Sequence, residues 1–200
     1  MAEPAGWRIV APGSADDVDK AGLRLVATGR GSLRRIVGES EERYRLFARR
    51  IRWDRVLLIV NEAGVSGGFV SFKSFGRGPY APGLGDFLSA FGARTGWWRF
   101  IAFWLIEGRD LGRGFYVYGL KVAVSQRRQG LAAMLLAAAE SEAWRRGAAH
   151  VSLEVAETNS AAKALYTSQG YLPVSTFRLR FLLKYMGIAD LLLLRKPRPA

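Results

Sequence analysis

The sequence feature that most constrains the fold is the alternation of strand-like and helix-like segments in the second half of the chain. A mostly apolar run, Phe115–Val124, precedes Gly130–Arg146, whose alanine and leucine content strongly favours helix. His150–Val155 then predicts a strand, Asn159–Ser168 a helix and Gly170–Phe177 another strand. Strands that alternate with helices bury their apolar faces against each other, so the sequence predicts a mixed α/β architecture.

The first half of the chain predicts further strands and helices. Trp7–Ala11 is typical of a short strand, after which Ser14 or Asp16 can cap a helix. Apolar residues recur at close to helical spacing across Ser32–Arg52, which predicts a helix there. A β-hairpin is expected to follow that helix.

The hairpin signal lies in two apolar runs, Val56–Val60 and Val65–Lys73, which flank a glycine-bearing turn. The pair Gly67–Gly68 in the second run indicates a bulge or a close approach of another backbone. At the other end of the chain, Tyr185–Arg195 predicts the last strand. The basic and apolar alternation of Phe177–Tyr185 leaves a cleft lining, a dimer contact and an anionic membrane contact open.

Ser74–Gly114 interrupts this pattern. A glycine- and proline-rich lead-in is followed by the aromatic-rich stretch Phe87–Ile106, for which we expect helix with a break at Thr95–Gly96. The aromatic side chains fit a lid, a dimer face or an apolar pocket, and they equally fit a helix pair that packs on the sheet. Because the segment precedes the strand Phe115–Val124, we expect it to shape one side of a site there.

Composition bounds the chemistry. The 200 residues suit one domain, which we expect to span 1–200. The chain has no cysteine, which excludes disulfides, thiolate metal ligands and a thiol nucleophile. His150 is the only histidine, which excludes a multi-histidine metal site, so we expect no metal. No secretory signal opens the chain and no apolar run reaches the length of a membrane span, so a cytoplasmic location is expected.

The net charge of +13 is unusual for a chain of this size. Such a field attracts phosphates, acidic protein surfaces, nucleic acid and anionic lipid without choosing among them. An arginine-rich and alanine-rich composition can also reflect a GC-rich genome. No nucleic-acid-binding motif is present, so no specific nucleic-acid partner is expected. A peripheral contact with a membrane is a less favoured reading of the charge.

The segment from Val122 to Ala132 carries the clearest chemical signal. An apolar strand ends, a turn with Arg127 and Arg128 follows, and a helix opens at Gly130. Free N–H groups and the positive end of the helix dipole bind phosphate well, and glycine lets an anion approach the backbone. The pattern therefore indicates a phosphate-bearing ligand at a strand-to-helix turn. A plain turn with solvated arginines is the alternative that spacing alone leaves open.

This turn resembles a known signature. Arg127–Ala132 matches the Q/R-x-x-G-x-G/A pattern of the GNAT superfamily of N-acetyltransferases, with Gly130 as its glycine and Ala132 in its last small position. The resemblance implies a GNAT-type fold, which is a mixed, mostly antiparallel central sheet flanked by helices. Residues 74–114 would then be a helical insertion before the cofactor-binding strand.

Later segments extend the resemblance. Val151–Val155 looks like the next strand of the family, Asn159–Tyr166 like its N-x-x-A-x-x-x-Y helix, and Gln169–Tyr171 like the start of its following strand. The likeness is close over about 115–195 and loose in the N-terminal half. In its C-terminal half the chain looks like enzymes that acetylate the N-terminal alanine of ribosomal proteins.

The resemblance implies acetyl-CoA as the acyl donor. The turn would hold the CoA pyrophosphate through backbone N–H groups, and the strand edge before it would pair with the pantetheine arm. A backbone N–H at that edge would also polarise the thioester carbonyl. The implied cofactor-binding residues are Val122, Ala123, Val124, Arg127, Arg128, Gln129, Gly130, Leu131, Ala132 and Asn159.

The implied catalytic residues are Tyr166 and Glu154. Tyr166 would act as the general acid that protonates the departing CoA thiolate, although a core aromatic is the alternative. Glu154, twelve positions earlier, would be the general base for the amine, although a salt-bridged glutamate or a water chain in its place remains open. Glu157 and Tyr118 are lesser candidates for the base.

These inferences predict an N-acyltransferase that moves an acetyl group from acetyl-CoA to a primary amine of a protein or a small molecule. A homodimer is compatible with the aromatic segment. Two other classes stay open. One is a catalytically inactive CoA-binding or partner-binding module with the same fold, and the other is a nucleic-acid-binding protein that uses the basic charge.

Overall fold

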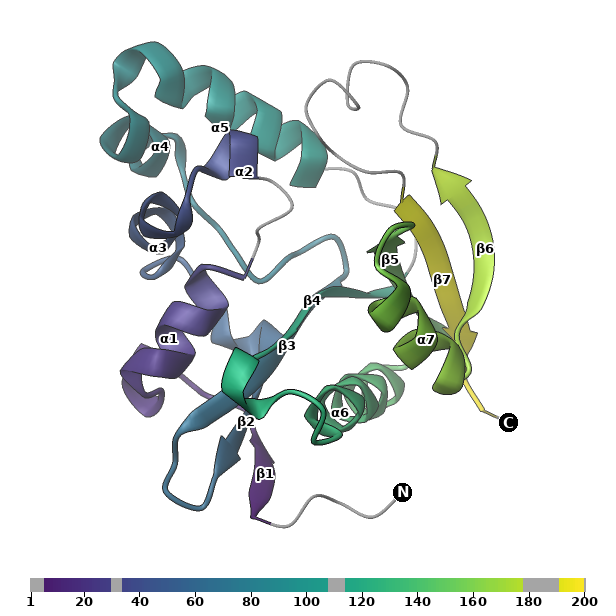
Figure 1. Ribbon diagram of the computed structural model, residues 1–200. Coiled ribbons are helices and arrows are strands. Elements are labelled where there is room, and N and C mark those ends of the chain that lie inside the picture. Colours follow the sequence, from purple (N-terminus) through teal and green to yellow (C-terminus); the bar gives the residue numbers. More distant parts are fainter. Residues whose placement is uncertain (1–5, 30–33, 108–113, 178–190, 200) are drawn as a thin grey trace.

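The computed structural model describes residues 6–29, 34–107, 114–177 and 191–199, and these residues form one mixed sheet flanked by helices (Figure 1). The order along the sheet is β1-β2-β3-β4-β5-β7-β6, and every neighbouring pair is antiparallel except β4 and β5. The expected mixed, mostly antiparallel architecture is therefore confirmed. The strands are β1 (Trp7–Val10), β2 (Val56–Asn61), β3 (Ser66–Ser74), β4 (Phe115–Val122), β5 (His150–Ala156), β6 (Leu172–Phe177) and β7 (Leu191–Pro197).

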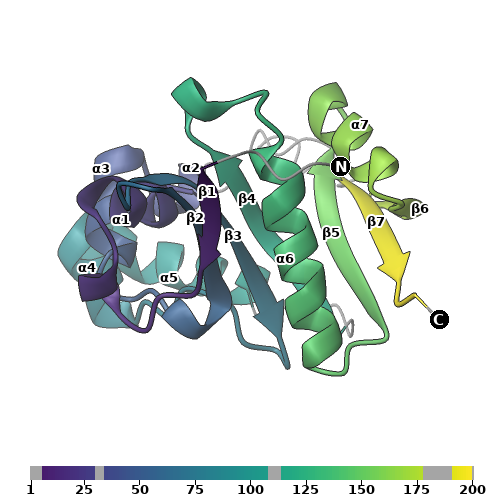
Figure 2. The same cartoon turned by 90° about the horizontal axis from the view of Figure 1, so that it is seen from below.

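Helices cover both faces of the sheet (Figure 2). The helices are α1 (Lys20–Ala27), α2 (Arg34–Val37), α3 (Ser40–Phe47), α4 (Leu84–Phe91), α5 (Ala93–Glu107), α6 (Leu131–Arg145) and α7 (Ser160–Ser168). One core forms where α6 and α7 meet the sheet, and a second forms where α1 to α5 meet its other face. Side chains of β2 alternate between the two cores: Ile59 belongs to the first, and Leu58 and Val60 belong to the second.

The β-hairpin is present as expected, and the glycine pair forms its bulge. Ile59 lies opposite Gly68 and Val60 lies opposite Ser66, so Gly67 is the extra residue of β3. A Cβ atom at Gly67 would lie 2.3 Å from the ring of Trp7, which packs over it. The glycine at the bulge therefore leaves room for the Trp7 ring of β1 to pack against the hairpin.

Two N-terminal expectations need correction. Ser14 caps only a short 3-10 turn, and the first α-helix, α1, instead begins after Asp19, whose carboxylate accepts from the Gly22 N–H at 3.1 Å. The single helix expected across Ser32–Arg52 is divided into α2 and α3 at Gly38, in the part of that stretch the structure describes. Gly38 has a φ of 79°, which ends α2, and Glu39 starts the next helix.

The break in the aromatic segment lies earlier than expected. Gly92, with a φ of 74°, separates α4 from α5, whereas Thr95 and Gly96 lie inside α5. Gly96 serves packing rather than chain reversal, because its Cα faces the backbone of α4. A Cβ there would lie 2.6 Å from the carbonyl oxygen of Phe87. The two helices can cross this closely only with glycine at that position.

This contact predicts a strong effect of Gly96→Val. The added side chain would meet backbone atoms, which cannot rotate away, so we expect the free energy of unfolding to fall by about 1–3 kcal/mol in urea titrations. Gly85→Ala in α4 is the matched control, since its Cβ would meet nothing within 4 Å. That control should be neutral or stabilising by up to about 1 kcal/mol, because alanine favours helix. Equal losses in both variants would contradict the close helix crossing.

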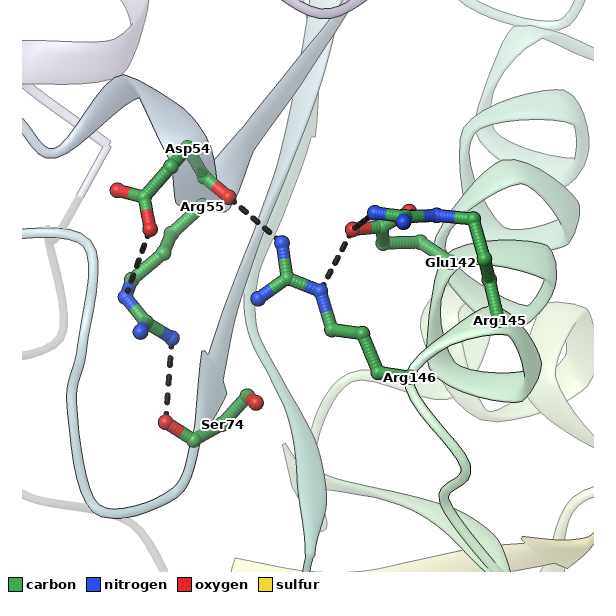
Figure 3. Close-up of polar contacts among 6 residues, drawn as sticks. All are labelled: Asp54, Arg55, Ser74, Glu142, Arg145 and Arg146. Atoms are coloured by element: carbon green, nitrogen blue, oxygen red, sulfur yellow. Dashed lines mark hydrogen bonds and ion pairs between the residues drawn. The ribbon is translucent and has the colours of Figure 1, made fainter.

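An arginine network anchors the carboxyl end of α6 to the start of β2 and the end of β3 (Figure 3). Glu142 accepts from Arg145 at 2.7 Å and from Arg146 at 2.6 Å, and these bonds, above all the one from Arg145, hold the pKa of Glu142 below its usual value. Arg146 also donates to the Asp54 carbonyl at 3.0 Å. Arg55 donates to the Ser74 carbonyl at 3.1 Å. The network fixes the carboxyl end of α6 relative to the sheet.

The strand ends differ from expectation in three places. β4 stops at Val122, and Val124 belongs to a 3-10 turn, Val124–Gln126. β6 begins at Leu172, because Gly170 occupies a turn with a φ of 85°. The last strand is described over Leu191–Pro197 and so extends beyond its expected end at Arg195, while residues 185–190 of the expected strand lie outside the described residues.

Candidate active site

The central feature of the site is a wedge between β4 and β5. These parallel strands pair only over Phe115–Val117 and Val151–Leu153. Beyond that point β4 keeps β3 as its neighbour and β5 keeps β7, and no described residue pairs with the facing edges. The wedge therefore presents an open strand edge of β4, from Tyr118 to Val122, to which an extended ligand can add as a strand.

A bulge in β4 marks the point where the wedge begins. Ser71 lies opposite Gly119 and Phe72 lies opposite Val117, so Tyr118 is the extra residue of β4 at the bulge. The bulge changes which side chains face which core. Val117 faces the α6 core, and so does Leu120 after the bulge, while the intervening Tyr118 faces the core of α1 to α5.

The topology brings the predicted cofactor turn and the predicted acid to one edge of the sheet. Because β4 and β5 are parallel, their carboxyl ends lie at the same edge. The turn that leads into α6 follows β4, and α7 follows β5 (Figure 2). Residues 127–132 and Tyr166 therefore lie on either side of the wedge, as a shared site requires.

The turn before α6 has the geometry of an anion site. Gly130 is the N-cap of α6 with a φ of 78°, and Arg128 also has a left-handed φ, of 63°. Such a φ is costly for a side-chain-bearing residue and is found most often where function requires it. No described residue accepts a hydrogen bond from the N–H groups of Leu131 and Ala132. These N–H groups and the dipole of the 15-residue helix are available to a phosphate.

Cations surround this turn. Arg127 and Arg128 are both exposed, and Lys121 lies half-buried on β4 near Arg127. Burial lowers the pKa of the Lys121 ammonium, and Arg43 and Arg127 lower it further by repulsion. A half-buried cation with two like-charged neighbours is stabilised by an anionic ligand.

The residues predicted to contact the pantetheine arm lie at the end of β4, just beyond it, and at the start of α7. The N–H of Ala123 donates to the Gly67 carbonyl at 2.8 Å and is therefore used within the sheet. Because backbone groups alternate sides along a strand, the N–H and C=O of Val122 face the wedge instead. Val124 lies beyond the strand and is 76% exposed. Asn159 caps α7, where its side chain accepts from the Ala162 N–H at 3.1 Å.

Tyr166 is buried on the α6 and α7 side of the sheet. Its ring centroid lies 6.0 Å from that of Tyr171. Burial raises the pKa of Tyr166 to about 12, so the phenol is protonated throughout the neutral range. Its hydroxyl group makes no hydrogen bond to a described residue. A protonated phenol without a partner can donate to a ligand.

A partly buried ion pair packs beside this tyrosine pair. Lys196 on β7 donates to the Glu140 carboxylate on α6 at 2.6 Å, and its ammonium lies 5.8 Å from the ring centroid of Tyr171. Burial, and then the nearby Glu140 charge, raise the pKa of Tyr171 far above its usual value. The ion pair fixes α6 relative to β7 and so holds Tyr171 against Tyr166.

Glu154 lies on the opposite face of the sheet from Tyr166. Its neighbours Leu153 and Val155 on β5 face the core that contains Tyr166, so alternation turns Glu154 away from it. One carboxylate oxygen, Oε1, is buried and has no hydrogen-bond partner in the described part of the chain. Tyr166 and Glu154 therefore lie on opposite faces of the sheet, with the wedge between them. Glu157, the lesser candidate, is exposed.

Glu107 is a site residue that the sequence patterns did not reveal. The Tyr118 hydroxyl hydrogen-bonds to Oε1 of Glu107, at the end of α5. Lys73 donates to the Glu107 backbone carbonyl. Tyr116 on β4 lies opposite Ser152 on β5. Two residues further along each strand, Tyr118 and Glu154 lie on that same face of the sheet, at the point where the strands have separated. Glu107 therefore lies over the face of the sheet that carries Glu154. Its position depends on the packing of α5 against β4, which the sequence does not show.

The described residues suit a phosphate-bearing cofactor but offer no cluster of metal ligands. The free N–H groups before α6, the open space around the Gly130 Cα and the cationic surroundings suit a phosphate-bearing molecule such as CoA. The described residues contain no group of three or more histidine, cysteine, aspartate or glutamate side chains arranged to hold a metal ion. Within the same residues, no helix has the length and apolar character needed to cross a membrane.

Comparison with known proteins identifies the family. The sequence profile of the acetyltransferase (GNAT) family matches residues 37–171, which is more than half of the chain, so the protein belongs to this family. No curated protein matches the chain significantly. The predicted superfamily is therefore confirmed, and with it the acetyltransferase class.

Two solved structures share the fold, and a third is similar over a smaller part of its chain. Ard1 from Thermoplasma volcanium is 14% identical with a TM-score of 0.57, and the match covers 98% of this chain and 100% of that one. The ribosomal-protein-S18-alanine N-acetyltransferase from Escherichia coli is 16% identical with a TM-score of 0.54, over 96% and 93% of the two chains. Nourseothricin acetyltransferase is 21% identical with a TM-score of 0.48, and the match covers 72% of this chain but only 65% of that one.

Proposed function

We propose that this protein is an acetyl-CoA-dependent N-acetyltransferase that acetylates a primary amine in the wedge between β4 and β5. The observation that carries the proposal is the wedge itself, with an anion-binding turn and a buried phenol at its carboxyl edge and an unpartnered carboxylate oxygen on the opposite face. The amine belongs to a protein or to a small molecule.

Donor binding rests on the turn and on the open edge of β4. The N–H groups of residues 129–132, with Arg127 and Arg128, bind the pyrophosphate of the donor. Val122 pairs with the pantetheine arm through its free backbone groups. Asn159, which caps α7 through its side-chain oxygen, adds a further polar contact beside the arm.

The chemical step follows from the positions of Glu154 and Tyr166 on opposite faces of the sheet. The amine nitrogen attacks the thioester carbonyl carbon, and Glu154 accepts the proton that the nitrogen loses. Backbone N–H groups at the β4 bulge stabilise the oxyanion that forms. As the carbon–sulfur bond breaks, Tyr166 gives its proton to the departing thiolate. Tyr118 and Glu107 lie on the same face of the sheet as Glu154 and form the alternative route for the proton of the amine.

The direct test is calorimetric titration of the full chain with acetyl-CoA and with CoA, followed by thiol release against a panel of peptide and small-molecule amines. Micromolar binding together with thiol release would support the proposal and identify the class of acceptor. Binding without release for any amine would favour the inactive CoA-binding module. A folded sample that binds neither donor nor product would exclude the proposed function.

Glu154→Gln tests the general base. The variant keeps the shape of the side chain but cannot accept a proton, so we expect kcat for thiol release to fall by about a hundredfold while acetyl-CoA affinity is unchanged. Glu157→Gln is the control, because Glu157 is exposed and lies three residues further along the chain. If Glu107→Gln lowers kcat and Glu154→Gln does not, the proton leaves through Tyr118 and Glu107 instead.

A further inference from the structure

Helix α5 exposes an apolar face that the acetyl-transfer site does not use. Of the large apolar side chains exposed in the described residues, five lie on this one helix: Trp97 at 53%, Trp98 at 38%, Ile101 at 46%, Trp104 at 62% and Leu105 at 57%. Their spacing of three, four and seven residues places them on one side of the helix. Scattered exposed apolar residues are ordinary, but a contiguous patch marks an interaction surface.

The charge of this face is one-sided. The exposed side of α5 includes one ionisable residue, Arg94, and no acidic one. Arg99 lies at its margin, where its guanidinium lies 4.3 Å from the ring centroid of Phe91 and 5.5 Å from that of Trp98 and donates to the Ile36 carbonyl at 3.3 Å. The single acidic residue of α5, Glu107, is turned toward Tyr118. The face is therefore apolar with cationic residues within it and beside it.

The rest of the helix is firmly held, so the exposed face is not a sign of loose packing. Gly96 lies against the α4 backbone, and Phe103 is buried among Phe47 and Phe87 with ring centroids 5.8 and 5.5 Å away. Figure 1 shows α5 at the periphery of the molecule, on the side away from α6. A rigid helix therefore presents its tryptophans outward.

We propose that the tryptophan face of α5 binds the surface of an anionic lipid bilayer. Tryptophan is enriched at membrane interfaces, because its ring is apolar and its indole N–H stays hydrated. A helix that lies in the interface needs an apolar face and attraction to anionic headgroups, and a protein of net charge +13 supplies the second. The same charge opposes a second copy as the occupant, since two such chains repel each other.

This inference goes beyond the proposed function and does not depend on it. It also differs from the expectation from the sequence, in which a peripheral membrane contact was a less favoured explanation of the positive net charge. The aromatic residues of 87–106 could all have been core, and only the packing of Phe87, Phe100 and Phe103 inward shows that the tryptophans are left outside.

Co-sedimentation of the full chain with vesicles tests the proposal. We expect binding to phosphatidylcholine vesicles that contain phosphatidylserine, little binding to phosphatidylcholine alone, and loss of binding at high salt. Trp97→Ser/Trp104→Ser should lower the partition coefficient at least about tenfold, because two apolar anchors are removed. Arg94→Glu should weaken binding to the anionic vesicles as well. Fluorescence of the bound wild-type protein should shift to the blue as tryptophan enters the interface.

The control is Leu172→Ser/Val174→Ser, which removes two comparably exposed apolar side chains, 62% and 49%, from the edge strand β6. It should bind vesicles like the wild type. Three results would overturn the proposal: no vesicle binding by the wild type, equal losses in the control and the tryptophan variant, or a wild-type dimer that the tryptophan variant converts to monomer. The last result would assign the face to a second copy. Thermal unfolding checks that each variant is folded.

Discussion

Tyr166→Phe should lower kcat for acetyl transfer by about a hundredfold or more while the Kd for acetyl-CoA stays unchanged. The phenol is buried, protonated and without a described partner, so its loss removes a proton donor and little else. A thiolate that leaves without a proton raises the barrier of the step but does not alter ground-state binding. Single-turnover thiol release and calorimetry on the same preparation separate the two quantities.

Tyr171→Phe is the matched control for this prediction. Tyr171 is a second buried tyrosine that packs against Tyr166, and its hydroxyl group lies near the Glu140 carboxylate. It should retain activity. The pH dependence gives a further check, because a group with a pKa of about 12 remains protonated far into the alkaline range. Tyr166 should therefore impose no loss of rate below about pH 11. Equal activity of both variants would exclude Tyr166 as the acid.

Arg127→Gln/Arg128→Gln should raise the Kd for acetyl-CoA and for CoA by about ten- to hundredfold. Charge-assisted hydrogen bonds to phosphate contribute more than neutral ones, although the solvent exposure of both arginines reduces the effect through screening. The effect should shrink as salt is added. At saturating donor, kcat should change little, because neither side chain touches the reacting atoms.

The control for the arginine pair must remove the same charge elsewhere. Arg49→Gln/Arg198→Gln does so at two exposed positions, after α3 and after β7. This variant removes two of the positive charges that make up the net +13 without touching the turn before α6. A comparable rise in Kd in both double variants would show that donor binding responds to the overall field and not to a site at this turn.

Prediction from the sequence was most successful where a local pattern and a local interaction coincide. Alanine and leucine content placed α6 to within a residue at each end, and the apolar run with two valines placed β5. Gly130 was expected to open the helix, and its left-handed φ is a local requirement that only glycine meets without cost. The hairpin and its bulge at Gly67 were also predicted correctly.

Prediction failed where two patterns compete within one segment. Apolar spacing ran through Gly38 without interruption, so one helix was expected where a left-handed glycine makes two. In the aromatic segment, two glycines could end a helix, and periodicity does not say which of them packs against a backbone and which reverses the chain. The close approach of Gly96 to Phe87 decides this, and the approach exists only in the folded state.

The sequence by itself determined the family and proposed the candidate cofactor turn, acid and base, because these depend on residue types at short, fixed spacings. Only the tertiary structure decided the rest. It placed β7 between β5 and β6, opened the wedge beyond Val117, put Glu107 beside Tyr118 and left the α5 tryptophans outside. The physical reason is that strand order, strand separation and exposure follow from which distant surfaces bury each other, and no local pattern records that choice.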